Sequence, residues 1–187
     1  MFFSYITHLS DLDQRRLDLI GKIKNILDPQ IGDVYYIMDP YLDVVQSIQD
    51  PLKEDRIEDE SWSFLLTSLA KNDVQFKIIT RVELDGLISI NQRPPFSIAD
   101  SGKLYGATIE ICKYTDTKYE GLTIHDRYIL KENGSSVKGL HLGPSLADIQ
   151  NKDVSLTVFS KEGVRAAIIC FKDIWQECIN RRGWKKG

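Results

Sequence analysis

The sequence predicts an α/β fold in which a mixed β-sheet is flanked by helices. Three observations lead to this prediction: amphipathic helical segments lie near both ends of the chain, short strand-like runs lie between them, and a hairpin signal joins two of the later runs. The expected order is helix, strand, helix, strand, four further strands and a closing helix. No internal repeat and no linker-like stretch divides this order, so we predict one domain over residues 1–187.

The first half of the chain alternates helices with strands. Leucine and isoleucine recur at helical spacing from Ser10 to Leu27, and Pro29 ends this predicted helix. Residues 34–38 (VYYIM) form an apolar run that is typical of a buried strand, and Asp39 with Pro40 closes it as a turn. We also predict a short helix over 62–70, a strand over 74–82 and an irregular stretch over 85–104.

The second half of the chain is rich in strands. Strand-like alternation or β-branched content occurs at residues 107–113, 122–131, 137–142 and 154–159. The triplet Glu132-Asn133-Gly134 is a hairpin-turn signal between the second and third of these runs. Apolar residues at helical spacing then predict the closing helix over 163–179.

Composition limits the classes of protein and partner. With 42% hydrophobic and 27% charged residues, the chain has the composition of a folded domain rather than a disordered one. Its 24 basic and 27 acidic residues give a net charge of −3, so any contact with nucleic acid has to be local. The start of the chain lacks the pattern of a secretory signal, and no apolar run approaches the roughly 18 residues of a membrane span. We therefore expect a cytoplasmic protein.

Cysteine and histidine spacing gives no sign of a metal centre. The three cysteines are Cys112, Cys170 and Cys178, and no two of them have the spacing of a CxxC motif. No cluster of cysteine and histidine has the spacing of zinc ligands either. We expect free thiols in a reducing compartment, and neither a metal nor another cofactor.

The segment with the most chemical content is the predicted strand that contains His125 and Arg127. Alternation places these two side chains on one side of the strand, and the following hairpin returns the chain to Gly143 and Ser145. An imidazole, a guanidinium and a hydroxyl beside a glycine form a compact site for a phosphate group. The alternative is an ordinary surface face, in which a neighbouring carboxylate such as Glu132 pairs with Arg127.

Two further residues are candidates for binding substrate. His141 alternates with Gly139 and Gly143, which predicts the same side as the site, although a half-buried structural histidine is the alternative. Arg81 lies at the end of a predicted strand, where it adds positive charge to a site or remains on the surface.

A family resemblance rests on these residues. The spacing of His125, Arg127 and Glu132, followed by Gly143-Pro144-Ser145-Leu146, resembles the phospholipase D superfamily signature, which is His-x-Lys, four residues, Asp, and then a Gly-Ser or Gly-x-Ser element. Asp39-Pro40-Tyr41 after an early strand, and the strand at 153–159 before a closing helix, are also similar to members of this family. The implied fold is one half of a phospholipase D-like structure.

The resemblance implies a cleavage of phosphodiesters without metal. Active members use one histidine as the nucleophile at phosphorus and a second histidine, from a second motif, as the proton donor. This chain holds one motif, so the implied catalyst is a homodimer with two copies of His125 facing each other. Arg127 then corresponds to the phosphate clamp, Glu132 to the orienting carboxylate and Ser145 to a further donor, with Gly143 beside the substrate.

Three functions remain open at this point. The first is a nuclease, because the small single-motif members that the chain most resembles act on nucleic acid. The second is a catalytically silent module that binds phosphoinositide headgroups or a protein partner, because arginine and glutamate replace the family's lysine and aspartate at 127 and 132. The third is a dimerisation domain within a larger complex of the defence or restriction type.

Overall fold

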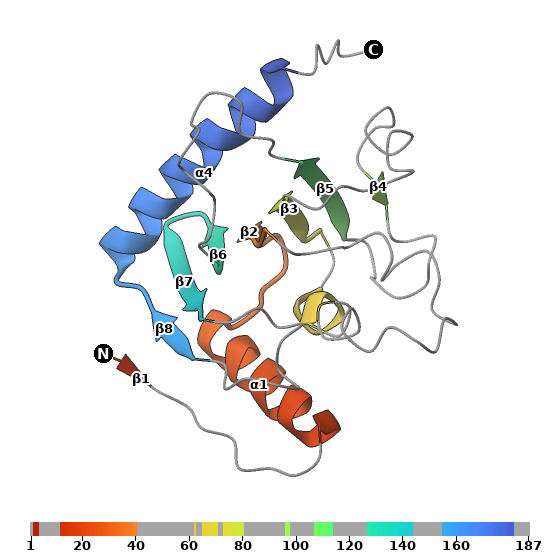
Figure 1. Ribbon diagram of the computed structural model, residues 1–187, viewed down its shortest axis with the longest axis vertical. Coiled ribbons are helices and arrows are strands. Elements are labelled where there is room, and N and C mark those ends of the chain that lie inside the picture. The colour runs from red at the N-terminus through yellow and green to blue at the C-terminus, as the bar shows by residue number, and fades with distance from the viewer. Residues whose placement is uncertain are drawn as a thin grey trace.

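The structure is a computed structural model that describes residues 2–3, 12–40, 62, 65–70, 73–80, 96–97, 107–113, 127–143 and 155–181. Its described strands form one eight-stranded mixed sheet (Figure 1). In spatial order the strands are β1 (Phe2–Phe3), β8 (Leu156–Val158), β7 (Ser136–Leu142), β6 (Arg127–Asn133), β2 (Val34–Met38), β3 (Gln75–Thr80), β5 (Thr108–Lys113) and β4 (Phe96–Ser97).

Strand directions define two ends of this sheet. The strands β2, β3 and β5 are parallel to one another, while β6 pairs antiparallel with β2 and continues through the hairpin into β7. The strand β8 is antiparallel to β7, so β2, β3, β5 and β7 all finish on the side where β6 and β8 begin. We call this side the carboxyl end of the sheet and the opposite side the amino end.

One face of the sheet is covered by α1 (Leu12–Leu27) and by a short helical segment at residues 65–69. The helix α1 ends where Asp28 takes a positive φ of 51° and its N–H donates to the carbonyl of Lys24, before Pro29. The buried side chains of this layer are Leu19, Ile23, Leu27, Tyr35, Ile37, Trp62, Leu65, Leu69, Phe76, Ile78, Ile129, Leu140, Leu142 and Leu156. We call this side the α1 face.

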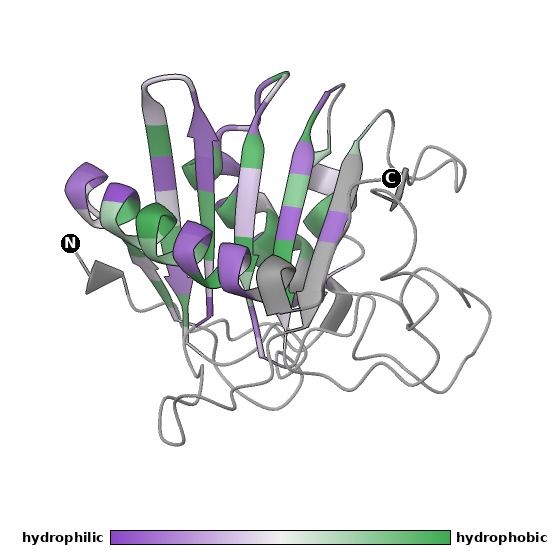
Figure 2. Cartoon of the chain, turned by 90° about the horizontal axis from the view of Figure 1, so that it is seen from above, coloured by the Kyte–Doolittle hydropathy of each residue, from purple (hydrophilic) through white to green (hydrophobic). Residues whose placement is uncertain are grey.

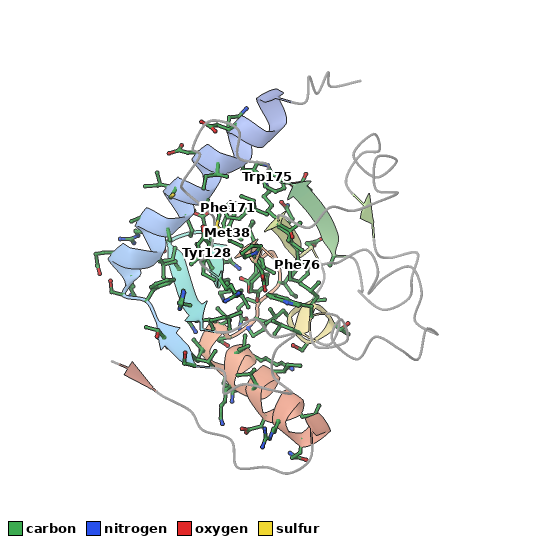
Figure 3. All side chains as sticks on the ribbon, viewed as in Figure 1. Met38, Phe76, Tyr128, Phe171 and Trp175 are labelled. Carbon is green, nitrogen blue, oxygen red and sulfur yellow. The ribbon has the colours of Figure 1, made fainter. Side chains whose placement is uncertain are left out.

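The opposite face is covered by α4 (Lys161–Arg181), which crosses the strands in Figure 2. Phe171 contacts Tyr36 edge-on and stacks on Trp175, at ring-centre distances of 5.2 and 5.8 Å. In Figure 3 both α4 aromatic side chains lie on the same side as Met38, in the second apolar cluster of the molecule. Close packing of α4 on β7 depends on Gly139, because a Cβ there would lie 2.8 Å from Leu130 Cδ2 and 3.0 Å from Val164 Cγ2. We call this side the α4 face.

The predicted α/β class with a mixed sheet and flanking helices is confirmed. The strand predicted over 34–38 has those bounds, and the hairpin turns at Gly134 with a φ of 57°. The closing helix begins two residues earlier than predicted, because Ser160 accepts a hydrogen bond from the N–H of Gly163 at 3.1 Å and caps it. The two-residue strands β1 and β4 were not predicted, since so short a run carries no periodicity.

Candidate functional site

The carboxyl end of the sheet holds three of the four predicted site residues that the structure describes. Arg127 is the first residue of β6. His141 is the next-to-last residue of β7, and Gly143 directly follows that strand. Ligands of open α/β sheets bind outside the carboxyl ends of the strands, so the predicted residues lie at the end where this architecture builds binding sites. Both faces of β6 are buried, however, so alternation along this strand separates two core layers rather than a core from a surface.

Arg127 is held by two groups from different strands. Its Nη1 donates to the carbonyl oxygen of Gly143 at 2.9 Å, and its Nε lies 3.7 Å from Oδ1 of Asp39, the residue after β2. The second distance is that of an ion pair rather than a hydrogen bond. The Asp39 side chain is fully buried, whereas the Arg127 side chain is 18% exposed. The guanidinium is therefore anchored from inside the protein, while part of the Arg127 side chain is exposed.

Gly143 lies where the hairpin brings it beside Arg127, as predicted. Its N–H donates to the carbonyl of Ser155 at 2.9 Å, which joins the end of β7 to the start of β8. A Cβ at this position would clash with Ser155 Oγ, so the Ser155 hydroxyl would have to turn away if Gly143 were replaced. The carbonyl that receives Arg127 belongs to a residue held by this backbone hydrogen bond to Ser155.

His141 lies at the same end of the sheet but on the other face. It pairs in register with Tyr128 and Thr157, and it alternates with Gly139, which packs against α4. Arg127 instead shares the α1 face with Ile129. The structure therefore does not place half-buried His141 on the side of Arg127, and the predicted shared side is wrong.

Glu132 is separated from Arg127 by the length of β6. Five residues of strand span about 17 Å, and Glu132 lies at the amino end on the α4 face. Its Oε2 accepts hydrogen bonds from the Tyr36 hydroxyl at 2.7 Å and from Lys172 Nζ at 2.8 Å. The structure thus joins Glu132 to α4 rather than to the site at the carboxyl end.

These contacts shift the acid–base equilibria of the three groups. Burial alone would raise the pKa of Glu132, but the hydrogen bonds from Lys172 and Tyr36 outweigh it and lower the pKa. The hydrogen bond that Lys172 donates to Glu132 raises the pKa of Lys172. Burial, together with the hydrogen bond that its own hydroxyl donates to Glu132, raises the pKa of Tyr36 to about 12. At neutral pH the Glu132 carboxylate is paired with the Lys172 ammonium, and this ion pair attaches α4 to β6.

The amino end holds a second buried pair on the α1 face. Lys131, 2% exposed, lies 3.2 Å from Oδ2 of fully buried Asp33 and donates to the carbonyl of Asp28 at 2.7 Å. Further donors to the Asp33 carboxylate are the N–H of Gln30 at 2.6 Å, the Tyr35 hydroxyl at 3.1 Å and Asn133 Nδ2 at 2.9 Å. Burial, followed by the Asp33 charge, raises the pKa of Tyr35. This cluster ties the end of α1 to the hairpin.

Three predicted site residues lie outside the described residues. These are His125, Ser145 and Arg81, so their geometry is not part of the site as described. Among the described residues, no group of three or more histidine, cysteine, aspartate or glutamate side chains has an arrangement for holding a metal ion. No helix in the described part of the chain has the length and apolar character to cross a membrane.

Asp39 is the site residue that the sequence analysis assigned a different role. Its position before proline predicts a turn, and nothing in the sequence identifies Arg127, 88 positions further along the chain, as its partner. The sequence does indicate that a partner exists, because a carboxylate directly after the apolar run VYYIM needs a buried partner if the run is a central strand.

Comparison of the chain with protein-family models, with curated proteins and with solved structures yields no match.

Proposed function

We propose that this chain is a metal-independent phosphodiesterase that cleaves nucleic acid as a homodimer. The observation that carries the proposal is the placement of Arg127 at the carboxyl end of the sheet, anchored by Asp39 and Gly143 and partly open to solvent. His125 precedes Arg127 by two residues, and two residues of chain span at most about 7 Å.

In the proposed reaction His125 attacks the phosphorus of the scissile phosphodiester. A P–N bond forms as the P–O bond to the leaving group breaks, and His125 of the second copy gives its proton to the departing oxygen. That second imidazole then accepts a proton from water, whose oxygen attacks phosphorus and breaks the P–N bond. The products are a phosphomonoester and an alcohol, and both imidazoles return to their starting states.

Arg127 supplies the positive charge in this scheme. A planar guanidinium matches the oxygens of a phosphate and stabilises the charge that they gain in the transition state. Ser145 and Arg81 are proposed to contact the substrate around it, with Gly143 allowing the backbone to come close. His141 is assigned no such contact, because it lies on the other face of the sheet. We assign Glu132 no part in the reaction, because its carboxylate is bound to Tyr36 and Lys172.

A cleavage assay in EDTA tests this proposal. Purified protein is incubated with single- and double-stranded DNA and RNA, and His125→Ala is compared with Glu132→Gln as a matched control at the other end of β6. We expect metal-independent cleavage that His125→Ala abolishes and Glu132→Gln retains. Absence of cleavage by folded, dimeric protein, or equal cleavage by His125→Ala, would contradict the proposal.

One observation favours a second candidate, a phosphate-binding module without catalysis. The structure separates Glu132 from Arg127, so the complete constellation that the sequence predicts does not assemble around one point. Such a module retains Arg127 for a phosphoinositide headgroup and needs no nucleophile. It predicts binding to phosphoinositide vesicles that weakens with salt and with Arg127→Ala, and that His125→Ala leaves unchanged.

A further inference from the structure

We infer that Asp39 is a positioning residue, whose carboxylate sets the orientation in which Arg127 meets a phosphate. This inference rests on the proposed function and deepens it, because it assigns a role to a residue outside the predicted motif. Asp39 follows β2 directly, and its backbone N–H donates to the carbonyl of Ile79 at 3.2 Å, which attaches it to β3. The carboxylate is therefore fixed to the centre of the sheet.

Two contacts on one planar group restrain more than its position. The Gly143 carbonyl accepts a hydrogen bond from Nη1, and the Asp39 carboxylate lies at ion-pair distance, 3.7 Å, from Nε. The hydrogen bond restrains the direction of the guanidinium, and the attraction to the buried carboxylate restrains its position. The 18% of the side chain that is exposed meets a ligand from the solvent side in one fixed orientation.

The negative charge of Asp39 has two opposing effects on a phosphate. It repels the anion and weakens ground-state attraction to Arg127, but it holds the guanidinium where the charge of the transition state develops. Loss of the charge therefore leaves substrate binding little changed and slows the chemical step. A residue needed only for folding would lower apparent kcat in proportion to the fraction of folded protein, so kcat is compared per folded molecule.

Asp33 provides a matched control for Asp39. Both carboxylates are fully buried, both flank β2 on the α1 face, and both pair with a base from β6. Asp33→Asn and Asp39→Asn each remove one buried charge from beside a base of β6. If burial alone mattered, the two variants would have the same consequences for folding and for activity.

The experiment combines EDTA-resistant cleavage kinetics with NMR of the arginine Nε–H groups in full-length wild type, Asp39→Asn, Asp39→Glu and Asp33→Asn. In the wild type we expect an Arg127 Nε–H that exchanges slowly with water. Asp39→Asn should lose this protection and lower kcat by about 100-fold, with KM within about threefold of the wild type. Asp39→Glu, which keeps the charge on a longer side chain, should recover part of kcat, and Asp33→Asn should leave kcat and the Arg127 signal unchanged.

The outcomes separate this inference from the proposed function. An unprotected Arg127 Nε–H in the wild type overturns the inference, whatever the activity. Unchanged kcat in Asp39→Asn, or an equal fall in Asp33→Asn, overturns it while the phosphodiesterase stands. If the wild type does not cleave, inorganic phosphate serves as the probe: a shift of the protected Arg127 signal that Asp39→Asn abolishes supports positioning for binding alone, and no shift overturns both.

Discussion

The two ends of β2 present the same kind of charge pair in different surroundings. At the amino end Lys131 is 2% exposed and meets Asp33 inside a network that also contains Tyr35 and Asn133. At the carboxyl end Arg127 is 18% exposed and meets Asp39 beside a backbone carbonyl. We call Lys131 with Asp33 the closed pair, because almost none of its surface is exposed to a ligand. We call Arg127 with Asp39 the open pair, because the Arg127 side chain is partly exposed while a buried carboxylate holds it from inside the protein. Equal burial of the two carboxylates thus coexists with different access to the two bases.

The largest expected effect is on stability at the amino end. Lys131→Met keeps the length of the side chain but leaves Asp33 buried without its ammonium partner, so the free energy of unfolding should fall by about 3–5 kcal/mol. Urea unfolding followed by circular dichroism measures the change. Lys138→Met is the control, because the Lys138–Asp28 pair at 3.1 Å is 36% and 60% exposed and should contribute far less to stability. Equal losses in the two variants would contradict the closed-pair description.

Gly139 in β7 and Gly143 directly after it separate the packing of α4 from the geometry of the site. Gly139→Ala forces a methyl against Leu130 and Val164 in the core, which should cost about 1–3 kcal/mol of stability. Gly143→Ala pushes on Ser155 next to the carbonyl that receives Arg127, so it should also weaken binding of inorganic phosphate. Chemical unfolding and phosphate titration measure both. If Gly139→Ala weakened phosphate binding as much as Gly143→Ala, at matched fractions of folded protein, the effect would not be specific to the residue beside Arg127.

Much of the fold follows from the sequence because its signals are local. The apolar run VYYIM, the turn at Gly134 and the stripe of α4 each specify an element within a few residues. The candidate site depends on pairings across the sheet, such as Asp39 with Arg127, that no local pattern contains. The side assigned to His141 was wrong because the hairpin turns its alternate residues toward α4. The spacing of Glu132 from His125 likewise contains no information about Tyr36 and Lys172, which bind Glu132 from β2 and α4.

Replacement of Arg127 by lysine should have an intermediate effect at the carboxyl end. A single ammonium cannot contact Asp39 and Gly143 as a planar fork does. Loss of one charged hydrogen bond, about 1.5 kcal/mol, corresponds to roughly tenfold weaker phosphate binding. Isothermal titration with inorganic phosphate measures this, and Arg165→Lys on the exposed surface of α4 is the control. Equal affinities of wild type and Arg127→Lys would contradict the role of the fork.

The smallest expected effect concerns the Glu132–Lys172 pair. Because the folded state lowers the pKa of Glu132 below its ordinary value of 4.5, the stability it contributes is present above that value and is lost as pH falls through the lower folded-state pKa. The side chains are 32% and 51% exposed, so Glu132→Gln should cost less than about 1 kcal/mol at neutral pH. The free energies of unfolding of the two proteins should converge as the pH falls below the folded-state pKa of Glu132. A difference that grows with acidity would contradict this sign.

The most direct test of the difference between the two ends is a backbone-amide NMR titration of the wild-type protein with inorganic phosphate. The account predicts chemical-shift changes concentrated at Asp39, Arg127 and Gly143, with Gln30, Asp33 and Lys131 unmoved. Changes centred on the amino end, or none at any phosphate concentration that leaves the protein folded, would contradict the assignment of the open pair as the functional one.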